Sequence, residues 1–188
     1  EKMELIKNGV DFELFQTSYA IPDDMVPIPR PIIGFGGKLS HLLDYELYNK
    51  CLEAHPDKSF VIVGQKLNEE VFNKINKTNN FFYLGDKHYS QYPSYVTHFD
   101  VGIIPYVNNH LDSGADSIKA YEYLAAGLSS LGTKGAGMSD LSEHMLVADN
   151  DQDFIQKIDK ALDQKNVITL PESHSWKFKT HYLVHLFA

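Results

Sequence analysis

One stretch of the chain places a carboxylate, a lysine and the start of a helix within a few residues of each other. Residues 111–127 read LDSGADSIKAYEYLAAG, and the pattern predicts a helix over 117–126 that Gly127 closes. Glu122 falls at the edge of the apolar stripe of that helix, one turn from Lys119. The free N–H groups of a helix start attract anions. The stretch therefore indicates either a ligand-binding site or a surface ion pair worth about 0.2–0.5 kcal/mol.

Two further segments have the composition of ligand-binding turns. The first, GFGGK at 34–38, follows an apolar run, and its glycines would let a phosphate group approach the backbone. It does not match the G-x-G-x-x-G pattern of dinucleotide sites, so a plain strand-to-helix turn is the alternative. The second, GDKHY at 85–89, is polar with one aromatic residue and could equally be a solvated loop.

No segment has the pattern of a metal centre. Residues 149–153 (DNDQD) contain D-x-D, which some metal-dependent sugar transferases use, but these acids precede a helix whose start they would stabilise. The nine histidines lack paired ligand spacing, and we expect loop or helix-surface positions for those at 41, 55, 88, 98, 110 and 144. Nucleophile elbows and P-loops are also absent from the sequence.

The elements that position these segments alternate between strands and helices. Apolar runs predict strands at 31–35, 59–63, 81–84, 100–104, 128–132 and 145–148. Asp44 is a plausible N-cap for a helix whose stripe is Tyr45, Tyr48, Cys51 and Leu52. Further helices are predicted at 68–77, 90–98, 117–126, 151–163 and 174–187.

This alternation predicts an α/β fold: a Rossmann-like, doubly wound parallel sheet of about six strands. Ligands bind beyond the carboxyl ends of such strands, where the three segments above would meet. Residues 21–31 contain four prolines, which indicates an extended segment. We therefore expect an arm at 1–30, the domain proper at 31–173 and a terminal helical segment at 174–188.

Composition excludes several function classes. With 17 Lys and Arg against 25 Asp and Glu, the net charge of −8 argues against binding nucleic acid or an anionic membrane through a broad basic face. The single cysteine, Cys51, excludes an intrachain disulfide and a multi-cysteine metal site, and it fits a reducing compartment. No apolar run approaches the roughly 18 residues of a membrane span, and the charged residues 1–7 do not resemble a signal peptide.

Five blocks of the sequence resemble the GT-B glycosyltransferases, in particular the nucleotide-sugar-dependent group that includes glycosyltransferase family 4 and its cell-surface polysaccharide relatives. The blocks follow the family's order over nearly the whole chain. They are NGVD at 8–11, FFYLG at 81–85 with the helix after it, FDVGIIPY at 99–106, SIKAYEYLAAG at 117–127, and Trp176.

The resemblance implies that this chain is similar to the second, donor-binding half of a two-domain enzyme. Such an enzyme transfers a sugar from a nucleotide-diphosphate sugar to an acceptor that binds mainly on the first half. The arm and the terminal helix would then be crossing segments. The resemblance also implies a cytoplasmic protein without metal or other cofactor, with any inner-membrane contact made by the missing half, and an isolated domain without efficient turnover.

The resemblance also assigns roles residue by residue. Glu122 would accept hydrogen bonds from the ribose hydroxyl groups. Ser117, Ile118 and Lys119 would meet the diphosphate at the helix start, while Gly36, Gly37 and Lys38 would flank the phosphate and the departing oxygen. Lys38 and Lys119 are thus the expected catalytic residues. The base would lie against Gly85, Asp86, Lys87, His88 and Tyr89.

The chain departs from the family pattern in ways that leave the outcome open. Gly114 stands where many retaining relatives carry an acid, although Asp112 and Asp116 lie nearby, and LSS at 128–130 replaces a more apolar strand. Retention or inversion is therefore not predicted. The alternatives are a stand-alone nucleotide-binding module without transferase activity and a GT-B-like epimerase.

Overall fold

The structure is a computed structural model that describes residues 3–107, 116–164 and 170–186. Its centre is a six-stranded sheet in which every neighbouring pair is parallel, with the order β3-β2-β1-β4-β5-β6. The strands are β1 (Ile32–Gly36), β2 (Ser59–Val63), β3 (Phe81–Tyr83), β4 (Val101–Ile104), β5 (Ser129–Thr133) and β6 (Leu146–Ala148). The predicted doubly wound, Rossmann-like α/β fold is confirmed, because this order reverses between β1 and β4.

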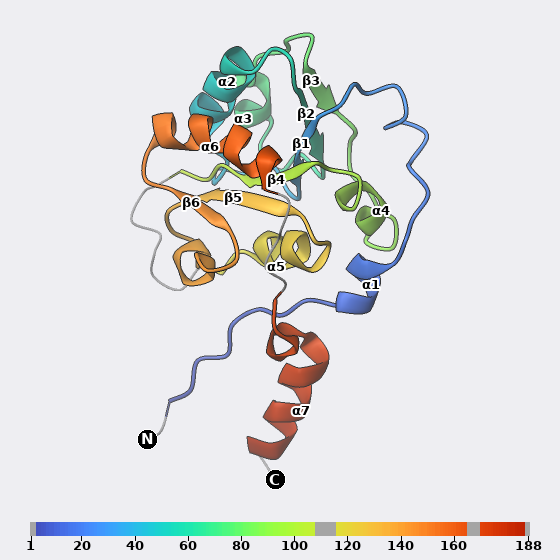
Figure 1. The fold of residues 1–188 in the computed structure, drawn as a ribbon, viewed down its shortest axis with the longest axis vertical. Helices are drawn as coiled ribbons and strands as arrows, with labels where there is room; N and C mark the ends of the chain where they lie inside the picture. Colours follow the sequence, from blue (N-terminus) through green and yellow to red (C-terminus); the bar gives the residue numbers. More distant parts are fainter. Residues whose placement is uncertain (1–2, 108–115, 165–169, 187–188) are drawn as a thin grey trace.

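Helices cover both faces of the sheet (Figure 1). One face carries α2 (Tyr45–Ala54), α3 (Glu69–Lys74) and α6 (Asp151–Asp163), and the other carries α1 (Phe12–Gln16), α4 (Tyr92–Val96) and α5 (Ile118–Ala125). Two 3₁₀ helices, η1 (Met138–Leu141) and η2 (Glu172–His174), and the helix α7 (Trp176–Leu186) complete the described elements. Because helices shield both faces, the inner strands β1, β2, β4 and β5 are buried along their whole length.

The sequence located the regular elements well. The strand at 59–63 and the helix at 151–163 have the predicted bounds, and the other strands shift by one residue or so. The Asp44 side chain caps α2 by accepting the Leu47 N–H at 2.9 Å, and Gly127 follows α5 with a φ of +73°, both as expected. The helices expected at 68–77 and 90–98 are shorter, at six and five residues.

The arm contributes to the core of the domain. Val10, Phe15, Met25 and Ile28 are all buried on the α4–α5 side of the sheet. Phe15 meets Tyr92 of α4 edge to face, with ring centroids 6.2 Å apart. The part of the arm from Val10 to Ile28 is therefore packed against the domain, although the assignment of residues 1–30 as an interdomain arm stays a prediction.

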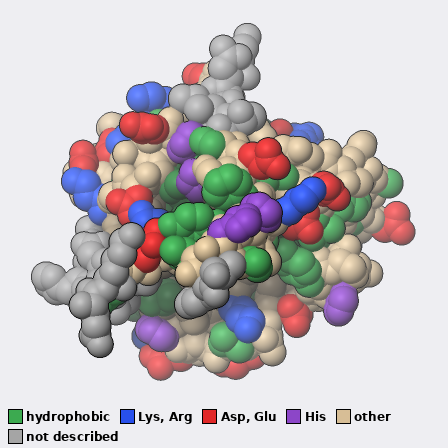
Figure 2. All heavy atoms as spheres, turned by 90° about the horizontal axis from the view of Figure 1, so that it is seen from below, with side chains coloured by type: hydrophobic (Ala, Val, Ile, Leu, Met, Phe, Trp, Pro, Cys, Tyr) green, Lys and Arg blue, Asp and Glu red, His purple; other side chains and the backbone are tan. Residues whose placement is uncertain are grey.

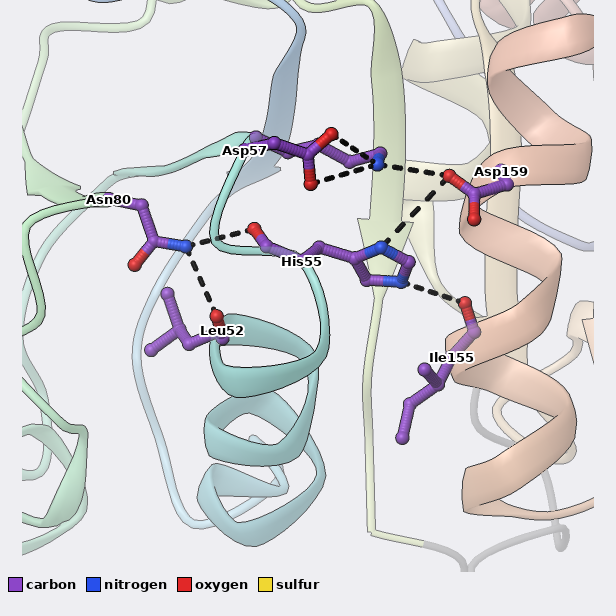
Figure 3. A network of polar contacts seen from close by, with 7 residues as sticks. Leu52, His55, Asp57, Asn80, Ile155 and Asp159 are labelled. Atoms are coloured by element: carbon purple, nitrogen blue, oxygen red, sulfur yellow. Dashed lines mark hydrogen bonds and ion pairs between the residues drawn. The ribbon is translucent and has the colours of Figure 1, made fainter.

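A polar cluster that includes the buried residues His55 and Lys58 ties α2 to α6 at the amino-terminal edge of the sheet (Figure 3). His55, the C-cap residue of α2, donates its Nε2–H to the Ile155 carbonyl at 3.0 Å, and the ammonium of Lys58 lies 3.0 Å from Asp159 on α6. The Asn80 amide donates to the carbonyls of Leu52 and His55, both at 3.1 Å. His55 follows the last residue of α2, as the expected loop position requires, but it is buried rather than on the surface.

Helix α7 and the first residues of the arm extend beyond the body of the sheet domain (Figure 1). The Lys179 ammonium on α7 donates to the backbone carbonyl of Lys7 at 2.8 Å, which holds the two segments together. Figure 2, viewed from this end, shows hydrophobic and histidine side chains gathered on one face. The exposed large hydrophobic residues of α7 are Trp176, Phe178, Tyr182, Leu183, Val184 and Leu186.

Candidate functional site

A cavity of about 300 Å³ opens at the carboxyl edge of the sheet, beside the point where the strand order reverses. Ligands bind at this place in doubly wound sheets. The turns after β1, β2 and β3 and the start of α5 supply its walls, and the lining residues are Gly36, Gly37, Lys38, Val63, Gly64, Gln65, Asp86, Lys87, Tyr89, Tyr92, Ile118, Lys119 and Glu122.

Two larger cavities, of about 580 and 640 Å³, lie elsewhere in the described parts of the chain. The first lies between α1 and the start of α7, and the second lies between the arm and the loop after β5. Both are lined by apolar as well as charged and polar residues, but neither combines a helix start with a glycine turn and a buried carboxyl group. We therefore place the candidate site in the smaller cavity.

The floor of the cavity is bare backbone. The Gly37 N–H donates to the Val63 carbonyl at 2.7 Å, and the Gly64 N–H donates to the Gly85 carbonyl at 2.8 Å, so the three turns are joined. Gly37 and Gly64 have φ values of +135° and +150°, which side chains disfavour. A Cβ atom on Gly64 would lie 2.0 Å from the Gly37 carbonyl oxygen. Only glycine fits here, and a ligand can approach the peptide groups closely.

Two lysines of the predicted site flank this turn. The Lys119 side chain crosses Gly37, since a Cβ atom there would lie 2.0 Å from the Lys119 Cε. Its ammonium is 5.6 Å from the ring centre of Phe35 and 5.5 Å from that of Tyr106. Lys38 is exposed at the rim. Neither lysine forms an ion pair within the residues that the structure describes, so the alternative of a Lys119–Glu122 ion pair is wrong.

Glu122 is more deeply placed than the edge of a helix stripe suggests. The residue is only 5% exposed, and burial raises the pKa of its carboxyl group to about 7. The Lys119 ammonium and the Tyr92 hydroxyl act in the opposite direction, but burial outweighs both. A ligand that brings hydroxyl groups to this buried site would donate hydrogen bonds to the carboxylate and stabilise its ionised form.

The start of α5 is open on the side of the cavity. Ser117 is the N-cap residue, but its side chain makes no capping bond, and its N–H donates to the Ala136 carbonyl at 2.9 Å. Asp116 is turned away from the cavity, because it accepts from the Asn8 N–H and from the Tyr121 hydroxyl at 2.9 Å. In the first helical turn the Ala120 N–H donates to the Ser117 carbonyl at 3.1 Å, while the N–H groups of Ile118 and Lys119 come before the helical hydrogen-bond pattern and can meet an anion.

Only some of the polar side chains in the loop after β3 line the cavity. Asp86 and Tyr89 are exposed and line the cavity. Lys87 also lines it, but its ammonium pairs with Asp24 of the arm at 2.7 Å. His88 does not line the cavity, and its Nδ1 is 2.8 Å from the Ser90 hydroxyl oxygen.

Most of the predicted site residues thus come together. Nine line the cavity: Gly36, Gly37, Lys38, Asp86, Lys87, Tyr89, Ile118, Lys119 and Glu122. Gly85, His88 and Ser117 do not line it, although Gly85 and Ser117 support its walls through the backbone. Sequence reasoning did not select Val63, Gly64, Gln65 or Tyr92. Gly64 had a signal, because it follows β2 much as Gly36 ends β1, whereas Tyr92 stood in a block of the family resemblance that assigned it no role in the site.

The D-x-D segment takes part in helix capping. Asn150 is the N-cap of α6 and accepts the Asp153 N–H at 3.0 Å, while Asp153 accepts the Asp149 N–H at 2.8 Å and pairs with Lys157 at 2.6 Å. Within the described residues no group of three or more metal-ligating side chains is found. Gly114, Asp112 and His110 lie outside the described residues.

The sheet order and the position of the cavity define a Rossmann-like ligand-binding domain. The family model described as glycosyl transferases group 1 matches residues 31–164, and the chain belongs to this family. A protein of Bacillus subtilis (strain 168), TuaH, whose name assigns it to teichuronic acid biosynthesis as a glycosyltransferase, is 28% identical over 180 residues. The match covers 92% of this chain but 45% of TuaH, so the chain spans less than half the length of this relative.

Solved structures with the same fold are themselves about twice as long as this chain. An apo structure of OtsA, which a second structure describes as a trehalose-6-phosphate synthase, aligns with a TM-score of 0.61 at 14% identity, over 84% of this chain and 43% of its own. An α,α-trehalose 6-phosphate synthase from Burkholderia multivorans gives 0.58 at 13% identity, over 96% and 46%. A structure described as a UDP-N-acetylglucosamine 2-epimerase from Listeria monocytogenes gives 0.58 at 12%, over 82% and 42%. At these identities the likeness shows the fold alone.

Proposed function

We propose that this domain is the donor-binding half of a glycosyltransferase and that it holds a nucleotide-diphosphate sugar in the cavity at the carboxyl edge of the sheet. The observation that carries the proposal is the buried Glu122 carboxyl group, which shares one cavity with a glycine turn and an open helix start. These three features suit the ribose, the diphosphate and the close approach that a nucleotide requires.

Glu122 is proposed to bind the ribose. A carboxylate has two oxygens and accepts hydrogen bonds from two neighbouring hydroxyl groups, as the resemblance to the family implies. Because Glu122 is only 5% exposed, those bonds would form away from competing water and would favour the ionised carboxylate.

The diphosphate is proposed to lie between the start of α5 and the glycine turn. Lys119 crosses Gly37 there, and Lys38 stands at the rim. In the transfer step, the acceptor forms a bond to the anomeric carbon and gives its proton to the general base, while the bond between the anomeric carbon and the phosphate oxygen breaks and that oxygen keeps the electron pair. Lysine ammonium groups and backbone N–H groups around it stabilise the charge that develops, which is a direct contribution to catalysis.

The base is proposed to lie against the loop after β3, next to Tyr89. The Lys87 ammonium already has a partner in Asp24, so backbone groups and the exposed ring of Tyr89 are the more available contacts. An aromatic ring stacks on any base. Tyr89 would therefore add to the affinity for every nucleotide without selecting one base.

The setting we propose is the synthesis of a cell-surface polysaccharide, which the name of TuaH supports. The acceptor and its general base would belong to the part of such an enzyme that this chain does not span. We further propose that the domain acts in the cytoplasm, needs no metal and does not turn over substrate efficiently by itself. No helix in the described residues is long and apolar enough to cross a membrane.

An epimerase is the second candidate, because one structural neighbour is described as a UDP-N-acetylglucosamine 2-epimerase. A stand-alone nucleotide-binding module is the third. The substrate separates these functions. An epimerase domain would change the sugar of a nucleotide sugar without an acceptor, whereas a transferase needs one, and a module changes neither.

The test is binding of UDP, GDP, ADP, TDP and CDP to the chain, measured by thermal unfolding and then by calorimetry for any nucleotide that shifts the midpoint. A ligand at 100 times its dissociation constant stabilises by about 2.7 kcal/mol. In the Glu122→Gln variant we expect the affinity to fall about 10- to 100-fold, since hydrogen bonds to a charged group are lost.

The matched control is Glu143→Gln, which removes an exposed carboxylate outside the cavity and should leave binding unchanged. Equal nucleotide affinity in a folded Glu122→Gln variant would remove Glu122 from the site. Failure of all five nucleotides to bind would contradict the proposal for this domain.

A further inference from the structure

Tyr92, on the first turn of α4, belongs to the helix that follows FFYLG in the family resemblance, but it has no role in the predicted site or in the proposed function, yet it lines the candidate cavity. We propose that Tyr92 is a positioning residue, whose hydroxyl group donates a hydrogen bond to the Glu122 carboxylate and directs that carboxylate towards the hydroxyl groups of a bound nucleotide. The inference rests on the proposed function and deepens it.

The first support is the state of the Tyr92 hydroxyl. Tyr92 is 9% exposed, and its hydroxyl oxygen is buried without a hydrogen-bond partner among the described residues. A buried donor without an acceptor lowers stability, and a phenylalanine would fill the same space without that cost. The hydroxyl group therefore needs an explanation other than packing.

The second support is the place of the ring. A Cβ atom on Gly36 would lie 2.3 Å from the Tyr92 hydroxyl oxygen, so the hydroxyl group lies directly over the glycine turn. Phe15 of the arm also packs against this ring, in an edge-to-face contact with centroids 6.2 Å apart. The ring therefore contacts both the arm and the glycine turn, and its hydroxyl oxygen is buried.

The third support is the Glu122 carboxyl group, which shares the cavity wall with Tyr92. The nearby Tyr92 hydroxyl group lowers the pKa of this carboxyl group. The two groups do not form a hydrogen bond in the structure. Hydrogen bonds in binding sites often tighten only when the ligand is present. Ionisation of Glu122 would strengthen this bond, because a carboxylate is the better acceptor.

The other groups around Glu122 allow the effect of Tyr92 to be isolated. Lys119 faces it from α5 and also lowers its pKa, while burial raises it to about 7. The remaining titratable groups that face Glu122 or line the cavity are Lys38, Asp86, Lys87, Tyr89 and Tyr123. All of them are kept in a Tyr92→Phe variant, so a change in the titration of Glu122 would report the lost hydroxyl group.

The experiment is calorimetry of wild type and Tyr92→Phe with whichever nucleoside diphosphate binds the wild type, at pH 7 and pH 9. If the variant raises the pKa of Glu122 by about one unit, binding should be about fivefold weaker at pH 7 and within about twofold at pH 9. The ligand's own titration cancels, because both proteins are compared at each pH. Equal weakening at both pH values, or none at either, overturns the proposal.

Tyr48→Phe is the matched control. The Tyr48 hydroxyl is also buried and without a partner among the described residues, but it lies on the α2 side of the sheet. This variant should leave the nucleotide affinity and its pH dependence unchanged.

A second readout needs no nucleotide. In a ¹³C NMR titration of the Glu122 carboxyl carbon, Tyr92→Phe should move the midpoint up by about one pH unit, whereas Tyr48→Phe should not. An unchanged midpoint overturns the contact between Tyr92 and Glu122. A raised midpoint in a protein that binds no nucleotide would keep the contact and contradict the proposed function instead.

Discussion

Ionisation of the buried Glu122 carboxyl group lowers the stability of the folded domain. Burial at 5% exposure raises its pKa to about 7, against an ordinary value near 4.5. The folded protein therefore binds a proton that the unfolded chain releases between these two pH values. Stability from this group falls as the pH rises through that window, and the full cost is present above pH 7. A group retained at such a cost fits a binding role.

Glu122→Gln should therefore stabilise the domain at alkaline pH while it weakens nucleotide binding. A shift of this size corresponds to about 3 kcal/mol, so we expect the variant to exceed wild type by up to about 3 kcal/mol at pH 8 and by much less at pH 5. Urea unfolding at both pH values measures the difference. Parallel stability profiles for the two proteins would show that the carboxyl group is not strained by burial.

The residue types of the candidate site could be predicted from the sequence, but the burial of Glu122 could not. The spacing of Lys119 and Glu122 on one helix, and the glycines after the first strand, selected most of the cavity wall. Tyr92 escaped because its importance depends on which helix packs beside Glu122, a contact between elements that are 30 residues apart. Burial of a carboxyl group at the edge of a helix stripe is decided by such contacts.

At the scale of elements, apolar runs and caps predicted the regular structure, and the short elements were missed. Helix α1 and the 3₁₀ helices η1 and η2 have five, four and three residues. Such short turns have little stability of their own and form because the surrounding fold holds them. Phe15, for example, fixes α1 by entering the core, and no periodicity can develop within five residues.

The end of α2 offers a test at this scale, away from the candidate site. Asn80 donates to the carbonyls of Leu52 and His55, which have no partner within the helix (Figure 3). Asn80→Ala should lower the free energy of unfolding by about 1–2 kcal/mol, as expected for two lost hydrogen bonds. Urea unfolding measures the loss, and nucleotide affinity should stay constant because Asn80 precedes β3 at the opposite edge of the sheet. An unchanged midpoint of unfolding would show that water replaces the amide without cost.

At the scale of the whole molecule, the arm and α7 differ in how they are anchored. The arm places four hydrophobic side chains in the core, whereas α7 has no buried residue in its described length. Six of its large hydrophobic residues are exposed, and Figure 2, viewed from this end of the molecule, shows hydrophobic and histidine side chains close together. The sheet domain therefore depends on residues before 31, even though the proline-rich segment suggested a boundary there, and a fragment beginning at residue 31 would lose part of its core.

Phe15→Ala tests this dependence without cutting the chain. Phe15 is 1% exposed and packs against Tyr92, so its removal leaves a cavity beside α4 and should cost about 3–5 kcal/mol of unfolding free energy. Val26→Ala is the control, because Val26 belongs to the same arm and is 60% exposed. We expect the control to change stability by less than about 0.5 kcal/mol. Urea unfolding of the two variants compares them directly. A small loss for Phe15→Ala would mean that the arm only covers the domain, while a large one makes the arm part of the unit that folds and holds the site.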